Sequence, residues 1–247
     1  MNRLGRAIAW WAILAAGLLA GNRAAPAVGP ASSATLLVPF STTYQVSYSG
    51  LPAQRTVVLD RQADHYALTA VTRLTGVAAL VGFGPVTERS RFEVHDGVIR
   101  PLLYTAGEEQ ANPDHDIRIE FDWSAEISRG FAKGADYSFP IEAGVQDPLS
   151  FELMARLDIA GGNREPIYTV HEGYQLRPYR FLEQGPDTLR IKGQHIDTVR
   201  YLIDRQSRRQ LYYWLAPTAD YLAVQLRQVQ KGKVKSTVLL LHSSLWP

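Results

Sequence analysis

Apolar and polar residues alternate with a period of two along much of this 247-residue chain. A strand points successive side chains to opposite faces of a sheet, so this alternation predicts half-buried β-strands. The clearest run ends at Gly50, and its one-face positions are Phe40, Thr42, Tyr44, Val46 and Tyr48. Further strands are predicted at residues 55–60, 66–71, 88–94, 98–105, 117–123, 126–131, 168–172, 174–182, 187–194, 197–203, 210–215, 222–231 and 233–241. Because turn signals separate these runs at roughly 8–12-residue intervals, the expected fold class is mainly β, with a curved antiparallel sheet or a partly open barrel.

One segment breaks the period of two and predicts a single principal packing helix over about residues 147–158. Asp147 is placed as the N-cap, with Pro148 at the first helical position. The apolar positions that follow have helical spacing and lie at Leu149, Phe151, Leu153, Met154 and Leu157. We expect this helix to pack on the sheet or to close its open end.

The segment Leu74–Pro85 is a second exception, because it is apolar, rich in glycine and almost uncharged. One interpretation is a buried connection under the sheet. The other is a mobile hydrophobic lip that contacts lipid or a partner.

The start of the chain has the pattern of an export signal. Arg3 and Arg6 precede the apolar run Ala7–Ala20, which is too short to span a membrane. Cleavage is expected after Gly21 or after Ala27, so residues 1–27 are predicted to be a signal peptide. Residues 28–39 are then expected to form a flexible leader, and residues 40–247 the ordered domain.

The composition limits the cellular compartment of the protein and the kinds of site that it can contain. The chain has no cysteine, which excludes disulfides, thiolate metal sites and a lipidated cysteine; Asn22 stands where a lipoprotein signal would carry one. Loss of the arginines at 3, 6 and 23 with the signal turns a net charge of +2 into −1, so overall charge gives no support for nucleic-acid binding. We expect a soluble periplasmic protein without a transmembrane segment after signal cleavage.

The segment Tyr137–Leu157 resembles the DUF3108 family of bacterial periplasmic proteins of unknown function. The resemblance is based on a short apolar pair, on the small and acidic residues after it, and on the sequence DPLSF that leads into the helix. The resemblance continues downstream at Tyr174–Gly185, Thr198–Tyr201, Arg208–Ala216 and Tyr221–Leu226. It covers roughly Tyr44 to the C-terminus and implies a curved antiparallel sheet similar to that of lipoprotein carriers, but no activity and no catalytic residues.

Residues with catalytic or metal-binding chemistry do not form a recognised motif. None of the six histidines has the close spacing of a helical metal-binding pair. The run Asp114-His115-Asp116 is read as a solvated turn, with a metal site as the alternative. Asp147 and Glu152 are read as a helix cap and a solvated side chain, with acid/base catalysis as the alternative. We therefore expect no catalytic residue, metal or cofactor.

Aromatic residues on neighbouring predicted strands suggest either a packed sheet core or a ligand cavity. Tyr212 and Trp214 are expected to share one face of their strand, while Tyr213 takes the other. The candidate ligand-binding residues are Tyr174, Tyr179, Phe181, Tyr212, Trp214, Leu80 and Phe83.

Basic residues gather in the C-terminal third of the chain. Most of them are expected at exposed strand ends and turns, with a patch for anionic headgroups or an acidic partner as the alternative. They include Arg200, Arg205, Arg208 and Arg209.

The pattern as a whole favours non-catalytic binding of a lipid or another hydrophobic component of the cell envelope. An interaction factor of envelope assembly, with a filled core and an envelope protein as partner, is the alternative. An enzyme that uses Asp, Glu or His as acid/base groups is the third hypothesis.

Overall fold

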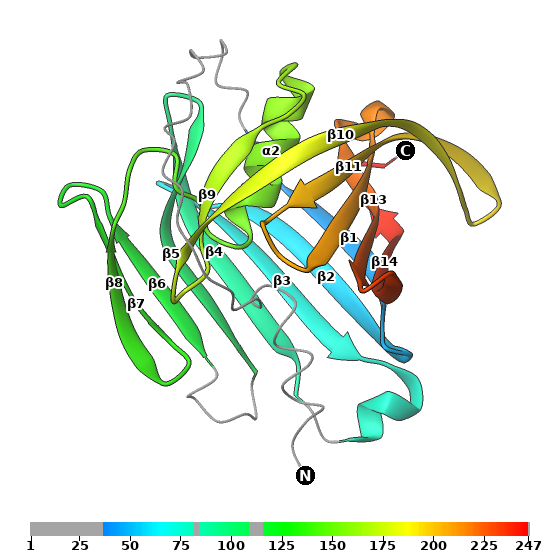
Figure 1. Ribbon diagram of the computed structural model, residues 1–247, viewed down its shortest axis with the longest axis horizontal. Helices are drawn as coiled ribbons and strands as arrows, with labels where there is room; N and C mark the ends of the chain where they lie inside the picture. The colour runs from blue at the N-terminus through cyan, green and yellow to red at the C-terminus, as the bar shows by residue number, and fades with distance from the viewer. Residues whose placement is uncertain (1–36, 82–83, 109–115, 247) are drawn as a thin grey trace.

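The computed structural model describes residues 37–81, 84–108 and 116–246, and within them one antiparallel sheet of 14 strands dominates (Figure 1). The predicted signal peptide, Phe83 and the pair Asp114-His115 lie outside the described residues. The strands are β1 (Phe40–Tyr48), β2 (Leu51–Arg61), β3 (Tyr66–Leu74), β4 (Val86–His95), β5 (Val98–Glu108), β6 (Ile117–Asp122), β7 (Ile127–Ala132), β8 (Ala135–Pro140), β9 (Ile167–His171), β10 (Leu176–Ile191), β11 (Gln194–Asp204), β12 (Arg209–Ala216), β13 (Leu222–Gln230) and β14 (Lys233–Ser243). The helices are η2 (Gly76–Val81), α2 (Ser150–Ala160) and η4 (Pro217–Ala219). In the described part of the chain, no helix is long and apolar enough to span a membrane.

The strands follow one another as two meanders that meet in the middle of the sheet. The order is β8-β7-β6-β5-β4-β3-β2-β1-β14-β13-β12-β11-β10-β9. The first and last strands therefore pair with each other, with Val46 opposite Val238. Hairpin turns explain this order, because antiparallel neighbours need only a short connection. The expected curved antiparallel sheet with one principal helix is confirmed.

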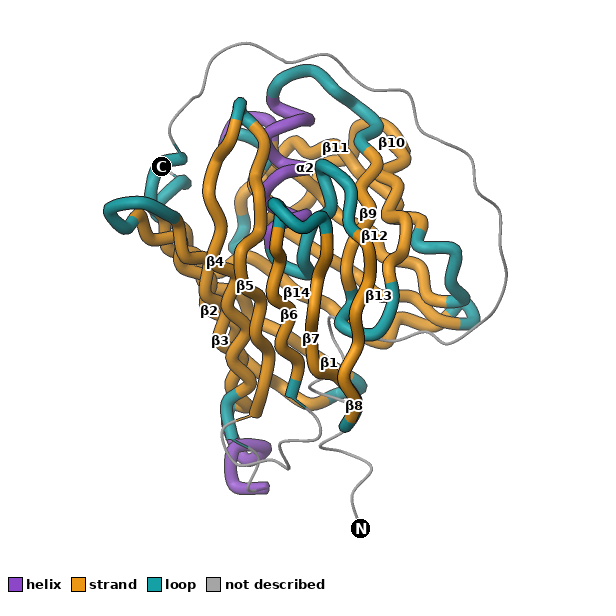
Figure 2. Tube along the Cα trace, turned by 90° about the vertical axis from the view of Figure 1, so that its left-hand side faces the viewer, coloured by secondary structure: helices purple, strands orange, loops and turns teal. Residues whose placement is uncertain are grey.

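Helix α2 lies inside the curve of the sheet, between the β4–β5 side and the β9–β11 side (Figures 1 and 2). It connects β8 to β9, the two strands at the sheet edges. Phe151 and Met154 of the helix belong to the same buried cluster as Tyr104, Tyr179 and Phe181 of the sheet. The Phe151 and Tyr179 rings meet edge to face at 4.9 Å. Burial of this helical face against the sheet removes apolar surface from water and so stabilises the fold.

The sequence analysis divided one strand wrongly and missed another. Residues 174–194 were expected to form two strands, but β10 runs unbroken from Leu176 to Ile191. A register shift between Glu183 and Gly185 accommodates the Gly185-Pro186 pair, so these residues make a bulge rather than a break. Strand β8 was not predicted, and none of the positions of its segment ADYSFP is buried.

The helix also begins later than expected. Leu149 is the N-cap and Ser150 the first helical residue, instead of a start at Asp147. Asp147 still satisfies the helix start, because its Oδ1 accepts the backbone N–H groups of Leu149 and Ser150 at 2.8 Å each.

Helix η2, the described part of the segment that follows Leu74, projects at the end of β3 instead of passing under the sheet (Figure 1). Val77 and Leu80 of η2 are each 83% exposed, whereas Ala78 is buried. The expectation of a buried connection was therefore wrong for these residues.

Candidate functional site

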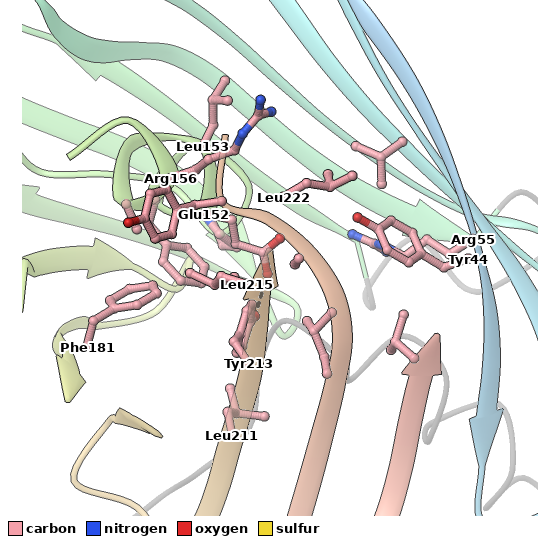
Figure 3. Close-up of a pocket in the computed structure, with 18 of the residues that line it drawn as sticks. Tyr44, Arg55, Glu152, Leu153, Arg156, Phe181, Leu211, Tyr213, Leu215 and Leu222 are labelled. Atoms are coloured by element: carbon pink, nitrogen blue, oxygen red, sulfur yellow. Dashed lines mark hydrogen bonds between the residues drawn. The ribbon is translucent and has the colours of Figure 1, made fainter. Parts of the chain in front are cut away.

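A cavity of about 160 Å³ lies between α2 and the inner face of the sheet (Figure 3). Its walls come from α2, from β1 to β4, from β10, and from β12, β13 and β14. Most of the lining is apolar, and includes Phe40, Val57, Phe151, Phe181, Leu215 and Val238. The cavity exists because the side chains of α2 do not fill the whole width of the curved sheet.

Glu152 is a carboxylate that α2 points into this cavity. Tyr213 Oη of β12 donates a hydrogen bond of 2.6 Å to Glu152 Oε1 (Figure 3). Protein surrounds Glu152 on most sides, and this desolvation raises the pKa of its carboxyl group. Its side chain remains reachable by water because it faces the cavity instead of packing against a neighbour. Glu152 is exposed to solvent as expected, and it also lines the cavity.

A second carboxylate, Glu88, is held in a charged network at the cavity wall. Arg55 Nη1 pairs with Glu88 Oε2 at 2.5 Å and also donates to Thr72 Oγ1 at 3.1 Å. Tyr104 Oη donates to the other Glu88 oxygen at 3.0 Å. Burial, reinforced by the Glu88 charge, raises the pKa of Tyr104, so this phenol stays protonated. Both charges of the Arg55–Glu88 pair are thus compensated within the protein.

Tyr44 of β1 contributes a hydroxyl group that is not used by the fold. Its side chain is buried and lines the cavity (Figure 3). Burial raises its pKa, with a further contribution from the charge of Glu152. Among the described residues, none forms a hydrogen bond with Tyr44 Oη. The cavity therefore offers a neutral hydroxyl on the β1 side and a carboxylate on the α2 side.

Arg205 is the residue of this site that the sequence reading placed wrongly. It follows β11 directly and was expected at an exposed strand end, but it is only 5% exposed and lines the cavity. A basic residue near a turn carries no sequence signal of burial, because most such residues are solvated.

The structure brings together two of the seven candidate ligand-binding residues. Tyr179 and Phe181 line the cavity. Tyr212 and Trp214 alternate with Tyr213 as expected, but it is Tyr213 that faces the cavity. Trp214 instead packs in a second buried cluster, and its Nε1 donates to Asp187 Oδ2 at 2.9 Å.

The remaining candidates lie elsewhere. Tyr174 is near Lys133, whose Nζ lies 3.0 Å from the Tyr174 ring centre. Leu80 is on the exposed face of η2, and Phe83 is outside the described residues.

Two further titratable side chains, Asp147 and His171, are buried among residues of the protein interior. Asp147 is fully buried, and Ser90 Oγ donates to its Oδ2 in addition to the two backbone bonds at its Oδ1. His171 is fully buried between the edges of Phe121 and Phe139. Within the described ranges, no three His, Cys, Asp or Glu residues are grouped so that they could hold a metal ion.

Comparisons with known proteins agree with this fold. A family model described as a protein of unknown function (DUF3108) matches residues 43–238. A β-barrel-like protein of the domain of unknown function DUF1849 from Brucella abortus superposes with a TM-score of 0.52 at 9% identity, over 84% of this chain and 97% of that chain. At such low identity the likeness shows the fold alone.

Two other solved structures align less closely. MucB gives a TM-score of 0.35 at 8% identity, over 85% of this chain and 54% of that chain. A protein with a YmcC-like fold from Bacteroides fragilis gives 0.34 at 11% identity, over 83% and 95%. Comparison with curated proteins gave no match.

Proposed function

This chain belongs to the DUF3108 family, whose function is unknown, and we propose that it binds a small apolar molecule, or the apolar part of a lipid, in the cavity under α2. The observation that carries the proposal is the apolar cavity of about 160 Å³ with a few polar groups at its wall. Pockets for small molecules combine a mostly apolar lining with a small number of placed polar groups in this way.

The size of the cavity limits what it takes. Its volume is close to that of an engineered cavity of about 150 Å³ that accepts benzene. Drug-sized ligands use pockets of about 300–1,000 Å³. We therefore propose a short alkyl chain or a single ring as the enclosed group, with any larger part of the ligand outside the cavity.

The periplasm is part of the proposal. The apolar run Ala7–Ala20 behind Arg3 and Arg6 supports export, and the absence of cysteine supports a protein without a lipid anchor. A hydrophobic component of the envelope is then the available ligand class.

A cavity-filling variant tests the binding site. Ala223 lines the cavity, and Ala223→Phe places a ring where the ligand would lie. We expect this variant to lose at least about tenfold in affinity for a fluorescent fatty acid, measured by titration. Ala67→Phe is the matched control, because Ala67 of β3 is half-buried but is not part of the lining.

Equal affinity of Ala223→Phe and the wild-type protein would contradict the proposed site. Mass spectrometry of protein purified from its native periplasm is the complementary measurement. Empty protein that also takes up no fluorescent fatty acid would overturn the binding function.

An acid/base enzyme is the second candidate, because titratable groups do converge on the cavity. Glu152, with its raised pKa, lies among Tyr44, Tyr213 and the Arg55–Glu88 pair. A carboxyl group of this kind can exchange protons with a bound substrate. Turnover of a panel of nitrophenyl esters that disappears in Glu152→Gln, while fatty-acid binding remains, would favour this candidate over simple binding.

A docking role has a different observation in its favour, namely the exposed Val77 and Leu80 of η2. Apolar side chains at the tip of a structure are frequent in interaction surfaces. Cross-linking in the native periplasm to a single partner, lost in Val77→Ser with Leu80→Ser, would support it.

A further inference from the structure

Arg205 is a buried cation whose charge is poorly compensated by the protein. It is 5% exposed, and its side chain is part of the cavity wall. Its guanidinium group lies over the Tyr179 ring, with Cζ 4.9 Å from the ring centre. A buried charge is costly unless it is paired and hydrogen-bonded.

The nearest carboxylate, Glu172, is already engaged with other residues. Glu172 is fully buried; its Oε1 accepts from Tyr179 Oη at 2.7 Å and its Oε2 from Gln175 Nε2 at 2.5 Å. Arg177 Nε lies 3.5 Å from Oε2, whereas Arg205 Nη2 lies 4.0 Å from Oε1. One carboxylate therefore faces two guanidinium groups, and Arg205 is the more distant of the two.

Arg205 also has unused hydrogen-bonding capacity. Its guanidinium group donates no hydrogen bond to any residue in the described part of the chain, and its Nε is fully buried without an acceptor. Guanidinium carries five N–H donors in a planar fork that matches a carboxylate or phosphate group. An anion that reached this wall of the cavity would supply the missing acceptors.

Each of the other arginines of the lining forms an ion pair or a hydrogen bond with the protein, or is exposed to solvent. Arg55 is paired with Glu88, and Arg156 Nε donates to the Asp220 carbonyl at 2.8 Å. Arg227 is exposed to solvent. Arg205 is therefore the arginine at which a bound anion would gain most.

We propose that Arg205 is the subsite for the head group of an amphiphilic anion of the fatty-acid type, whose apolar chain occupies the cavity. This inference rests on the proposed function and adds the charge of the ligand. The aromatic ring of Tyr179 holds the guanidinium plane, and the short apolar chain extends from it along the lining of Phe151, Phe181 and Leu215.

The test compares three ligands with the same alkyl chain: hexanoate, hexanol and hexylammonium. We expect calorimetry on the full mature protein to give hexanoate the highest affinity, at least about tenfold above hexanol, because charge-assisted bonds are the stronger ones. Arg205→Met, which keeps the apolar stem, should lose this preference, so that hexanoate and hexanol bind the variant with similar affinity. Arg208→Met is the matched control, since Arg208 lies in the same turn but is exposed and outside the lining.

The outcomes separate the two proposals. Equal binding of hexanoate and hexanol by the wild-type protein overturns the anion subsite and leaves the apolar site standing. Absence of binding for all three ligands overturns the proposed function and the subsite together. Competition by acetate or inorganic phosphate with the affinity of hexanoate would show a free-anion site and overturn the link to an apolar chain. If Arg205→Met does not fold, the comparison of ligands on the wild-type protein still decides, and Arg205→Lys should retain only part of the preference.

Discussion

Asp147 is a fully buried carboxylate at the start of α2, and its surroundings determine one part of the pH dependence of stability. Desolvation by burial raises its pKa to about 6, against the lowering effect of hydrogen bonds from Ser90, Leu149 and Ser150. The group ionises near its ordinary pKa of 3.8 in the unfolded chain. Between these values the folded state holds the proton more strongly, so this contribution to stability is present at low pH and is lost as pH rises through about 6.

Asp147→Asn removes this titration and should change the shape of the pH profile. We expect the free energy of unfolding of the variant to increase relative to that of the wild-type protein as pH rises from 4 to 7. The reason is that only the wild-type protein has a carboxyl group at this position that ionises and so loses stability. Urea unfolding followed by circular dichroism at several pH values measures this difference. The lowered pKa of His171, about 4 because of burial, acts in the opposite sense but is common to both proteins.

Asp122→Asn is a control of opposite sign. A hydrogen bond from Ser124 lowers the pKa of the exposed Asp122, so its contribution is present at neutral pH and is lost in acid. An Asp147→Asn difference that does not vary with pH would contradict the assignment of a raised pKa.

Single residues were predictable from sequence where local chemistry decides their role. Asp147 was expected to cap the helix, because an aspartate followed by proline and an apolar helical pattern is a local signal. Glu152 and Arg205 were not expected at one cavity, since its other walls come from strands far away in the sequence. The two-residue period of a strand predicted that Tyr213 faces the opposite side of the sheet from Tyr212 and Trp214. The same period does not reveal which of the two faces is concave.

At the scale of elements, α2 is the part that forms the site. The helix was predictable because its pattern has a period distinct from that of the strands around it. Its place inside the curve follows from its apolar face, which includes Phe151, Leu153, Met154 and Ile159. The cavity volume was not predictable, because it depends on how completely these side chains fill the space above the sheet.

Removal of the Phe151 ring should weaken the contact between α2 and the sheet. Phe151 is 4% exposed and packs edge to face on Tyr179, so we expect Phe151→Ala to lower the free energy of unfolding by about 3–5 kcal/mol. Leu157→Ala on the half-buried side of α2 is the control, with an expected loss of about 1–2 kcal/mol. Urea denaturation of both variants is the measurement, and equal losses would contradict the assigned packing of the helix.

At the scale of the whole molecule, the pairing of β1 with β14 joins the two meanders into one sheet. Val238 of β14 is 3% exposed and lies opposite Val46 of β1. Its strand is bonded on both sides, to β1 and to β13. Strand existence was predictable from local alternation, but this pairing was not, since no sequence signal links the two ends of the domain.

A proline in the middle of the sheet should therefore affect the whole molecule. We expect Val238→Pro to cost about 3 kcal/mol or more, because it removes backbone pairing in a strand that cannot separate without exposing the core. Ser138→Pro in the edge strand β8 is the control and should cost much less. Thermal unfolding and hydrogen exchange measure the effects, and a purely local loss of protection in Val238→Pro would contradict the central role of this pairing.

The neighbouring positions of β1 and β14 have a consequence for how fast the protein folds. Thr42 and Ser243 share a hydrogen bond of 2.8 Å across a sequence separation of 201 residues. A circular permutant that joins residue 246 to residue 37 by a short linker, and opens the chain between Gly162 and Asn163, turns the sheet into one continuous meander from β9 to β8. Its central contacts become local, which lowers the contact order, and folding rates rise as contact order falls. Stopped-flow refolding should show the permutant folding faster than the natural chain order at similar stability.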